Sequence, residues 1–167
     1  LNPGGVTCTG DPVSFMITVR PMITATIKRA GPNKFDVYLK PDFSNSTDYL
    51  FQMQFPIAFP ATAAATTSIS ADLDPAFVSN FGTYSTAIFD RASNTAGTVN
   101  YFVVSLNRTV STPQVFTAGT EFKVLTVTLQ NSPGLTEADL KLGDFQDGGS
   151  DGQGLYYVAD ASSNYYF

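Results

Sequence analysis

The sequence predicts an all-β protein, an antiparallel immunoglobulin-like or jelly-roll β-sandwich of about nine strands with no long helix. Short segments alternate apolar and polar side chains, as strands with one buried face do. Gly, Pro, Asn and Asp separate these segments at short intervals. No stretch repeats apolar residues at the spacing of a long amphipathic helix. A chain of 167 residues is long enough to bury one full core.

The N-terminal residues 1–21 are predicted to stand apart from a sandwich that spans residues 22–167. A polar leader rich in Gly and Pro comes first. Val13–Val19 then reads as a clear strand, with apolar residues at every odd position, until Pro21 ends it. This part is expected to be a linker, the remnant of a neighbouring domain, or a strand donated to another molecule. The candidate partner-binding side chains are the apolar Phe15, Ile17 and Val19.

Three strands are expected next, at Ile23–Arg29, Phe35–Leu39 and Tyr49–Phe55. A turn at Ala30–Asn33 separates the first two. In the third, one parity is all apolar and is predicted to face the core, with the side chains Tyr49, Phe51, Met53 and Phe55. The prolines in Pro56–Pro60 predict that the chain bends away from the sheet there.

The second half is expected to hold a short helical turn opened by Asp74, a hairpin and one central strand. The hairpin pairs Tyr84–Asp90 with Thr98–Leu106. The central strand is Phe122–Gln130, whose β-branched and aromatic residues suit a half-buried sheet. Its alternation changes parity between Val124 and Leu125, which predicts a β-bulge or a strand covered on both faces. Such a strand usually lies in the middle of a sheet.

Composition excludes several classes of function. The net charge is −5 and no Lys/Arg cluster occurs, so nucleic acid is not an expected partner. No apolar run is long enough to span a bilayer, and no membrane insertion is expected. Histidine is absent, which removes the commonest general base and metal ligand. Without it, Ser or Cys nucleophile arrangements lack their usual base, and we expect the protein not to be an enzyme.

The carboxylates Asp72, Asp74 and Asp90 could be read as paired acids for glycoside hydrolysis. No feature of the sequence brings any two of them to a working distance. We therefore expect them to be surface turn residues.

A glycine-rich loop near the C-terminus is the candidate metal site. Its carboxylates Asp144, Asp147 and Asp151 could surround a calcium ion together with backbone oxygens. The spacing does not match the EF-hand pattern. The alternative is a solvated turn in which Asp and Gly supply local hydrogen bonds and positive φ. No other cofactor is expected.

Two further features bear on an extracellular location. Asn45 and Asn107 each begin an N-glycosylation sequon. Cys8 is the only cysteine, so it is either an exposed thiol or half of a disulfide to another chain or to a domain outside this sequence.

The C-terminus is rich in aromatic residues, which could stack on sugar rings or on another protein. Alternation between core and rim would produce the same pattern without a ligand. The residues are Tyr156, Tyr157, Tyr165, Tyr166 and Phe167.

Three motifs carry a resemblance to a known family: Tyr49–Pro56, the hairpin return Ala96–Tyr101, and Phe116–Thr120 leading into the central strand. From about Ile23 onward the order of segments resembles a cohesin-like module, related to the sandwich carbohydrate-binding modules. Separately, Asp11–Pro21 resembles the closing strand of immunoglobulin-like or PKD-like repeats in large bacterial surface proteins. These resemblances imply an extracellular binding or structural module and leave the ligand open.

The sequence therefore predicts a non-catalytic module of the cell surface that acts in adhesion or assembly, including a filament subunit that uses its N-terminal strand. The alternative is a protein- or carbohydrate-binding module of a larger secreted protein. Other protein subunits, copies of the same chain or glycans are the expected partners.

Overall fold

A computed structural model describes residues 22–44, 50–93, 97–110, 115–133, 135, 139–143, 157–160, 162 and 165–166. Of these, residues 90–93, 157 and 165–166 are described by their backbone alone. The predicted strand Val13–Val19, the glycine-rich loop and most of the aromatic C-terminus lie outside the described residues or their side chains.

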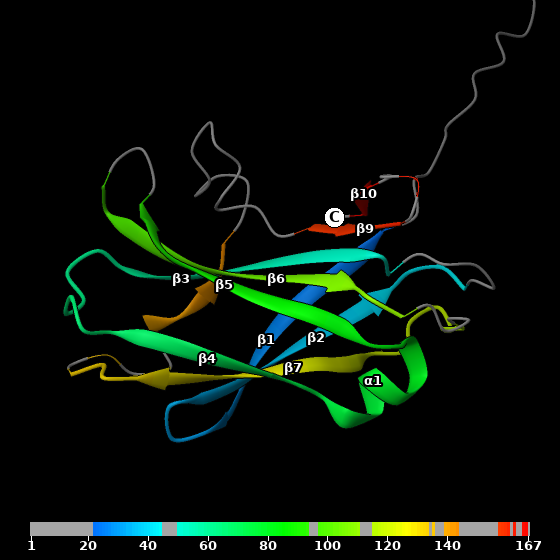
Figure 1. Cartoon of the computed structure of the whole chain (residues 1–167), viewed down its shortest axis with the longest axis horizontal. Coiled ribbons are helices and arrows are strands. Elements are labelled where there is room, and N and C mark those ends of the chain that lie inside the picture. Colours follow the sequence, from blue (N-terminus) through cyan, green and yellow to red (C-terminus); the bar gives the residue numbers. More distant parts are fainter. Residues whose placement is uncertain are drawn as a thin grey trace, which may run out of the picture.

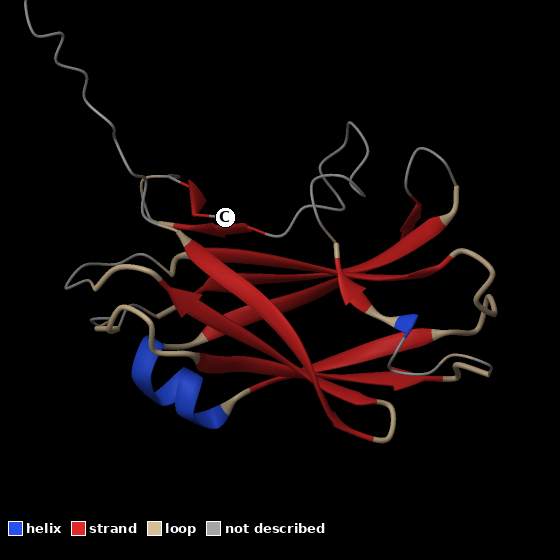
Figure 2. Cartoon of the chain, turned by 180° about the vertical axis from the view of Figure 1, so that it is seen from behind, coloured by secondary structure: helices blue, strands red, loops and turns tan. Residues whose placement is uncertain are grey.

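Two antiparallel sheets face each other in a sandwich (Figure 1). The first, here called the β7 sheet, has the order β1-β2-β7-β4. Its strands are β1 (Ile23–Gly31), β2 (Lys34–Pro41), β4 (Ser68–Leu73) and β7 (Phe122–Gln130). Figure 2 shows the same two layers from behind, with the short helix at one end. The predicted all-β sandwich without a long helix is confirmed.

The second sheet, here called the β3 sheet, has the order β10-β9-β3-β6-β5, and β8 also pairs with β3. Its strands are β3 (Gln52–Pro60), β5 (Tyr84–Ser93), β6 (Val99–Arg108), β8 (Lys141–Leu142), β9 (Tyr157–Ala159) and β10 (Tyr165–Tyr166). Strands β5 and β6 form the predicted hairpin, with a register shift between Phe89 and Ala92.

The predicted bend at Pro56–Pro60 is wrong, because β3 runs straight through these residues beside β6. The amide of Arg108 donates to the carbonyl of Phe51, so odd-numbered residues of β3 direct their backbone groups toward β6. Pro56 therefore directs its missing N–H toward the other neighbours, at the point where β9 gives way to β8. The hydrogen bonds between β3 and β6 do not use that amide, and the carbonyl of Pro56 still accepts from the amide of Gly143 at 2.8 Å, so a central strand tolerates the proline.

The predicted core face of this strand is confirmed at Met53 and Phe55, which are fully buried. It is wrong at Phe51, whose side chain is 40% exposed. Phe51 lies one residue before β3 begins, and the guanidinium of Arg108 lies over its ring at 5.5 Å from the centroid. Leu50 is fully buried in its place, so the parity of the buried side chains changes between Leu50 and the start of β3.

Helix α1 (Pro75–Phe81) follows β4 and is the one helix of several turns among the described residues. Asp74 caps it, accepting hydrogen bonds from the amides of Ala76 and Phe77 at 2.9 and 3.2 Å, and Pro75 occupies the first turn. The helix buries Phe77 and Phe81 against Tyr84 and Phe122, which closes one end of the sandwich. The predicted helical turn is confirmed and extended.

The core lies between the inner faces of the two sheets, and it includes the stacked rings of Phe59 and Phe102 at 4.6 Å between centroids. A second, smaller apolar cluster lies on the outward face of the β3 sheet, where Ala58 pairs with Tyr101 beside Val103. Strand β6 is thus buried on both faces, which explains why its sequence is almost continuously apolar.

Strand β7 lies between β2 and β4, and the prediction of a central strand with a bulge is confirmed. Val37 pairs with Leu125 while Tyr38 pairs with Lys123, so Val124 has no partner residue in β2. Both Val124 and Leu125 are fully buried. The extra residue lets Lys123 and Thr126 share the outward face of the sheet although their numbers differ in parity.

Candidate functional site

The outward face of the β7 sheet carries the densest group of polar contacts among the described residues. We call it the outer polar face. Its members alternate along β1, β2 and β7 with the side chains that fill the core. They are Thr26, Lys28, Asp36, Tyr38, Glu121, Lys123 and Thr126, and the cap residue Asp74 joins them at one side.

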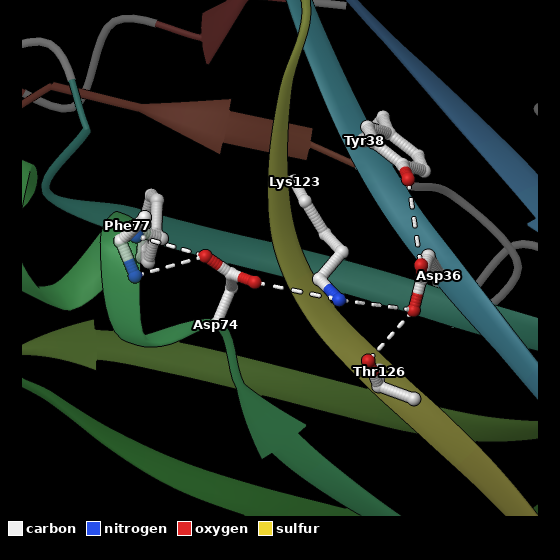
Figure 3. A network of polar contacts seen from close by, with 7 residues as sticks. Asp36, Tyr38, Asp74, Phe77, Lys123 and Thr126 are labelled. Carbon is white, nitrogen blue, oxygen red and sulfur yellow. Dashed lines mark hydrogen bonds and ion pairs between the residues drawn. The ribbon is translucent and has the colours of Figure 1, made fainter. Parts of the chain in front are cut away.

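Lys123 connects the two carboxylates of this face (Figure 3). Its Nζ lies 3.4 Å from Oδ1 of Asp36 on β2 and 3.3 Å from Oδ2 of Asp74 before α1. The carboxylates keep only 14% and 18% of their side-chain surface exposed, and Lys123 keeps 30%. This half-buried lysine therefore holds the sheet and the start of the helix together.

Asp36 is further bound by its neighbours on the strands. The hydroxyl of Thr126 donates to its Oδ1 at 2.6 Å, and the hydroxyl of Tyr38 lies 3.4 Å from its Oδ2. Asp74 is bound through both oxygens as well, because Oδ1 caps the helix and Oδ2 faces Lys123. The amide of Asp74 also donates to the carbonyl of Val124, the bulge residue, at 2.9 Å.

Opposing effects act on the pKa of Lys123. Desolvation lowers it, while the hydrogen bond to Asp74 and the charge of Asp36 raise it, and the net result is a pKa above the ordinary 10.5. A catalytic lysine needs the reverse shift, because only the neutral amine acts as a base or nucleophile. Lys123 is thus held as a cation that neutralises two acids.

A second ion pair lies at the β1 side of the same face, between Lys28 and Glu121. Glu121 also accepts from the hydroxyl of Thr26 at 3.2 Å, and the ammonium of Lys28 lies over the ring of Tyr38 at 4.4 Å from the centroid. The hydrogen bond from Lys28 lowers the pKa of Glu121 below its ordinary 4.5.

Replacing Glu121 with Gln should therefore remove a pH-dependent part of the stability. A lowered pKa means that the charged form is favoured in the folded state, so this contribution is present above pH 4.5 and is lost as the pH falls through the folded-state pKa. Thermal unfolding of both chains from neutral to acidic pH measures it. The melting temperatures should differ slightly at neutral pH and converge in acid. A difference that grows on acidification would contradict the assignment.

The described residues do not assemble a reactive centre. Each carboxylate of the outer polar face is occupied by a lysine, a hydroxyl or helix amides. Among the described residues no group of three or more His, Cys, Asp or Glu could hold a metal ion. A pocket of about 180 Å³ beside Ala58 and Lys141 and another of about 100 Å³ beside Ile27 and Leu140 are both smaller than typical ligand sites of roughly 300 Å³ or more.

Most of the sequence-predicted site residues lie outside this part of the chain. The proposed calcium ligands Asp144, Asp147 and Asp151, the partner-binding Phe15, Ile17 and Val19, and the sequon residue Asn45 all fall outside the described residues. The calcium site and its glycine-rich loop stay a prediction.

Of the remaining candidates, Asn107 is exposed near the end of β6, and Thr109 of the same sequon is also exposed. A glycan at Asn107 is sterically compatible with the described surface. The expectation of surface turn residues is wrong for Asp72, which is exposed on strand β4. It is also wrong for Asp74, which is half-buried as a helix cap and a lysine partner. The side chain of Asp90 lies outside the described part.

Sequence reasoning did not predict the Asp36–Lys123–Asp74 group, because its members come from three separate segments. Alternation alone places Asp36 and Tyr38 on an outward face. It does not reveal that β2 pairs with β7, or in which register, and these pairings bring the charges together.

Comparisons with known proteins match this chain to no protein-family model, no curated protein and no solved structure. Among the described residues, no helix has both the length and the apolar character needed to cross a membrane.

Proposed function

We propose that this chain is a non-catalytic extracellular module that acts in adhesion or assembly on a cell surface, with its N-terminal strand pairing to another copy of the chain. The observation that carries the proposal is the position of that strand. Val13–Val19 lies three residues before β1 in the sequence, and β1 is an edge strand of its sheet as described. An amphipathic segment is thus attached to a domain that presents a strand edge without a partner among the described residues.

Strand addition would stabilise such a contact in two ways. Backbone hydrogen bonds would extend the ladder, and the apolar side chains would leave water. Full burial of an aliphatic or aromatic side chain contributes about 1.5–3 kcal/mol. Phe15, Ile17 and Val19 together could therefore offset much of the entropy lost on association.

The described surface supports a structural role over a catalytic one. Its main polar group is a lysine with a raised pKa between two occupied carboxylates. The chain has no histidine, so the usual base for a Ser or Cys nucleophile is missing. The low content of charged residues, 14%, and the exposed sequon at Asn107 agree with an extracellular location.

Two substitutions on opposite faces of the N-terminal strand test the proposal. Ile17→Asp places a charge on the face predicted to be buried, and Met16→Asp places the same charge on the opposite face. Sedimentation velocity of the full chain over a wide concentration range should show association for the native chain and for Met16→Asp. Ile17→Asp should stay monomeric.

Circular dichroism serves as the control that all chains are folded. A native chain that stays monomeric at every concentration contradicts the proposal. So does association that Ile17→Asp leaves unchanged.

A second candidate function, a protein- or carbohydrate-binding module, is favoured by one aromatic residue. Phe89 on β5 pairs with Val103 and keeps 58% of its side chain exposed on the outward face of the β3 sheet. An exposed ring on a flat sheet can stack on a sugar or anchor a protein. Loss of binding to a glycan array on Phe89→Ala, with self-association unchanged, would favour this candidate.

A further inference from the structure

We infer that the outer edge of β1 is the acceptor for the N-terminal strand of a second copy of the chain. This inference rests on the proposed function and names the site that receives the strand. Residues 1–21 lie outside the described residues. The described chain begins at Met22, whose carbonyl accepts the first hydrogen bond of the β1–β2 pair. The partner copy would contribute Phe15, Ile17 and Val19, without which the edge is incomplete.

The backbone of β1 presents the hydrogen-bonding groups that strand addition needs. The carbonyl of Met22, one residue before β1, accepts from the amide of Asp42, one residue after β2, so even-numbered residues of β1 direct their backbone groups toward β2. Ile23, Ala25 and Ile27 therefore direct theirs outward. Among the described residues β1 pairs with no strand except β2.

The side chains of β1 suit an amphipathic partner. Ile23, Ala25 and Ile27 point toward the core, and the last two are half-buried. Strand β8 of the other sheet lies close to β1, but among the described residues only β2 pairs with it. Thr24, Thr26 and Lys28 point outward. An added strand would place its apolar parity beside the first set and its polar parity beside the second.

The length of the N-terminal strand also matches the length of the β1 edge. Val13–Val19 spans as many residues as the part of β1 in regular register with β2, Ile23–Arg29. At the far end of this edge a pocket of about 100 Å³ is lined by Ile27, Phe35 and Leu140 together with Lys28 and Arg29. An apolar side chain of the added strand could fill it.

The other edge strands of the two described sheets fit less well. Strand β4 is shorter, β5 carries a register shift between Phe89 and Ala92, and β10 spans Tyr165–Tyr166 alone. Bulges and short strands both hinder edge pairing.

The short link between Val19 and β1 explains why the strand must come from a second copy of the chain. The amide of Met22 donates to Oδ1 of Asp42 at 2.8 Å and its carbonyl is also bound to Asp42, so the chain is already extended along β2 at this residue. Only Arg20 and Pro21 remain to reverse the chain into a hairpin. The tight turns that join strands require positive φ at their first central residue, a position for Gly, Asn or Asp. Arg20 precedes a proline, which favours extended backbone instead.

The test uses the full chain with the edge blocked by Ala25→Pro. This change removes an amide that points outward and takes no bond from the β1–β2 ladder. Ala71→Pro on β4 is the matched control. The bond from the amide of Asp74 to Val124 sets the same alternation on β4, so Ala71 also directs its amide away from the sheet, at the opposite edge.

Ala25→Pro should abolish self-association in sedimentation velocity, while Ala71→Pro should associate like the native chain. A mixture of Ala25→Pro with Ile17→Asp should give a dimer and nothing larger. The first chain keeps a functional strand and the second keeps a functional edge. If Ala25→Pro does not fold, Ala25→Lys serves instead, because it directs a charge inward at the edge.

The outcomes separate the two proposals. If Ile17→Asp prevents association and both Ala25 variants leave it intact, the strand pairs elsewhere and the inference is wrong while the proposed function stands. If Ala71→Pro loses self-association to the same extent as Ala25→Pro, the inference is also wrong. If the native chain never associates, or if Ile17→Asp does not change its association, both the proposed function and the inference are wrong.

Discussion

Val124→Asp is expected to prevent the protein from folding, although simple alternation places this residue on the outward face. Thr126 and Thr128 have the same parity as Val124, and both are only half-buried. The bulge rotates Val124 out of that series into a fully buried position. An aspartate there would have to lose its hydration or its charge, at a cost of several kcal/mol or more. Small domains have about 5–15 kcal/mol of stability in total.

Thr128→Asp is the matched control for this prediction. It places the same side chain two positions along β7, on the outward face, where Thr128 pairs with Lys34. We expect this variant to fold normally. Val124→Thr keeps the shape of the side chain and buries a hydroxyl, and it should cost about 1–3 kcal/mol in urea unfolding. Normal stability of Val124→Asp would show that the bulge does not form.

Lys123→Met is expected to lower the free energy of unfolding by about 1.5–3 kcal/mol, the range measured for hydrogen bonds to charged groups. The substitution keeps the length of the side chain and removes its charge. Asp36 and Asp74 would then be left largely buried without the cation between them. Removing one partner of such a group is more harmful than the small net value of an ion pair suggests. Urea unfolding at neutral pH measures the effect.

Lys28→Met provides the comparison on the same face. Lys28 keeps 48% of its side chain exposed and its partner Glu121 keeps 30%, so water screens this pair. We expect no change that urea unfolding can resolve. Equal losses for Lys28→Met and Lys123→Met would contradict the role given to Lys123.

The contribution of Lys123 to the free energy of unfolding should also decrease at high pH. Its pKa is raised in the folded state, so its contribution is fully present below the ordinary value of 10.5 and is lost as the pH rises through the folded-state pKa. The difference between the native chain and Lys123→Met should therefore be constant around neutral pH and shrink in strong alkali.

The sequence by itself determined the strands and much of the core. Alternation identified β1, β2 and the β5–β6 hairpin, because a half-buried strand needs apolar side chains at every second position. Asp74 followed by Pro75 marked the start of α1 through local hydrogen bonding and a fixed φ. The change of parity at Val124 indicated the bulge. Each of these features depends on neighbouring residues, so the local sequence was sufficient.

Only the tertiary structure decided which strands are neighbours and what their outward side chains meet. Pro56 is accepted inside a sheet because its missing amide faces the junction between β9 and β8. Lys123 meets Asp36 and Asp74 because β2 and β4 flank β7 in particular registers. The position of β1 at an edge of the described β7 sheet likewise follows from the order of strands. Strand order and register are set by the packing of the whole core, and the alternation within any one strand is compatible with many pairings.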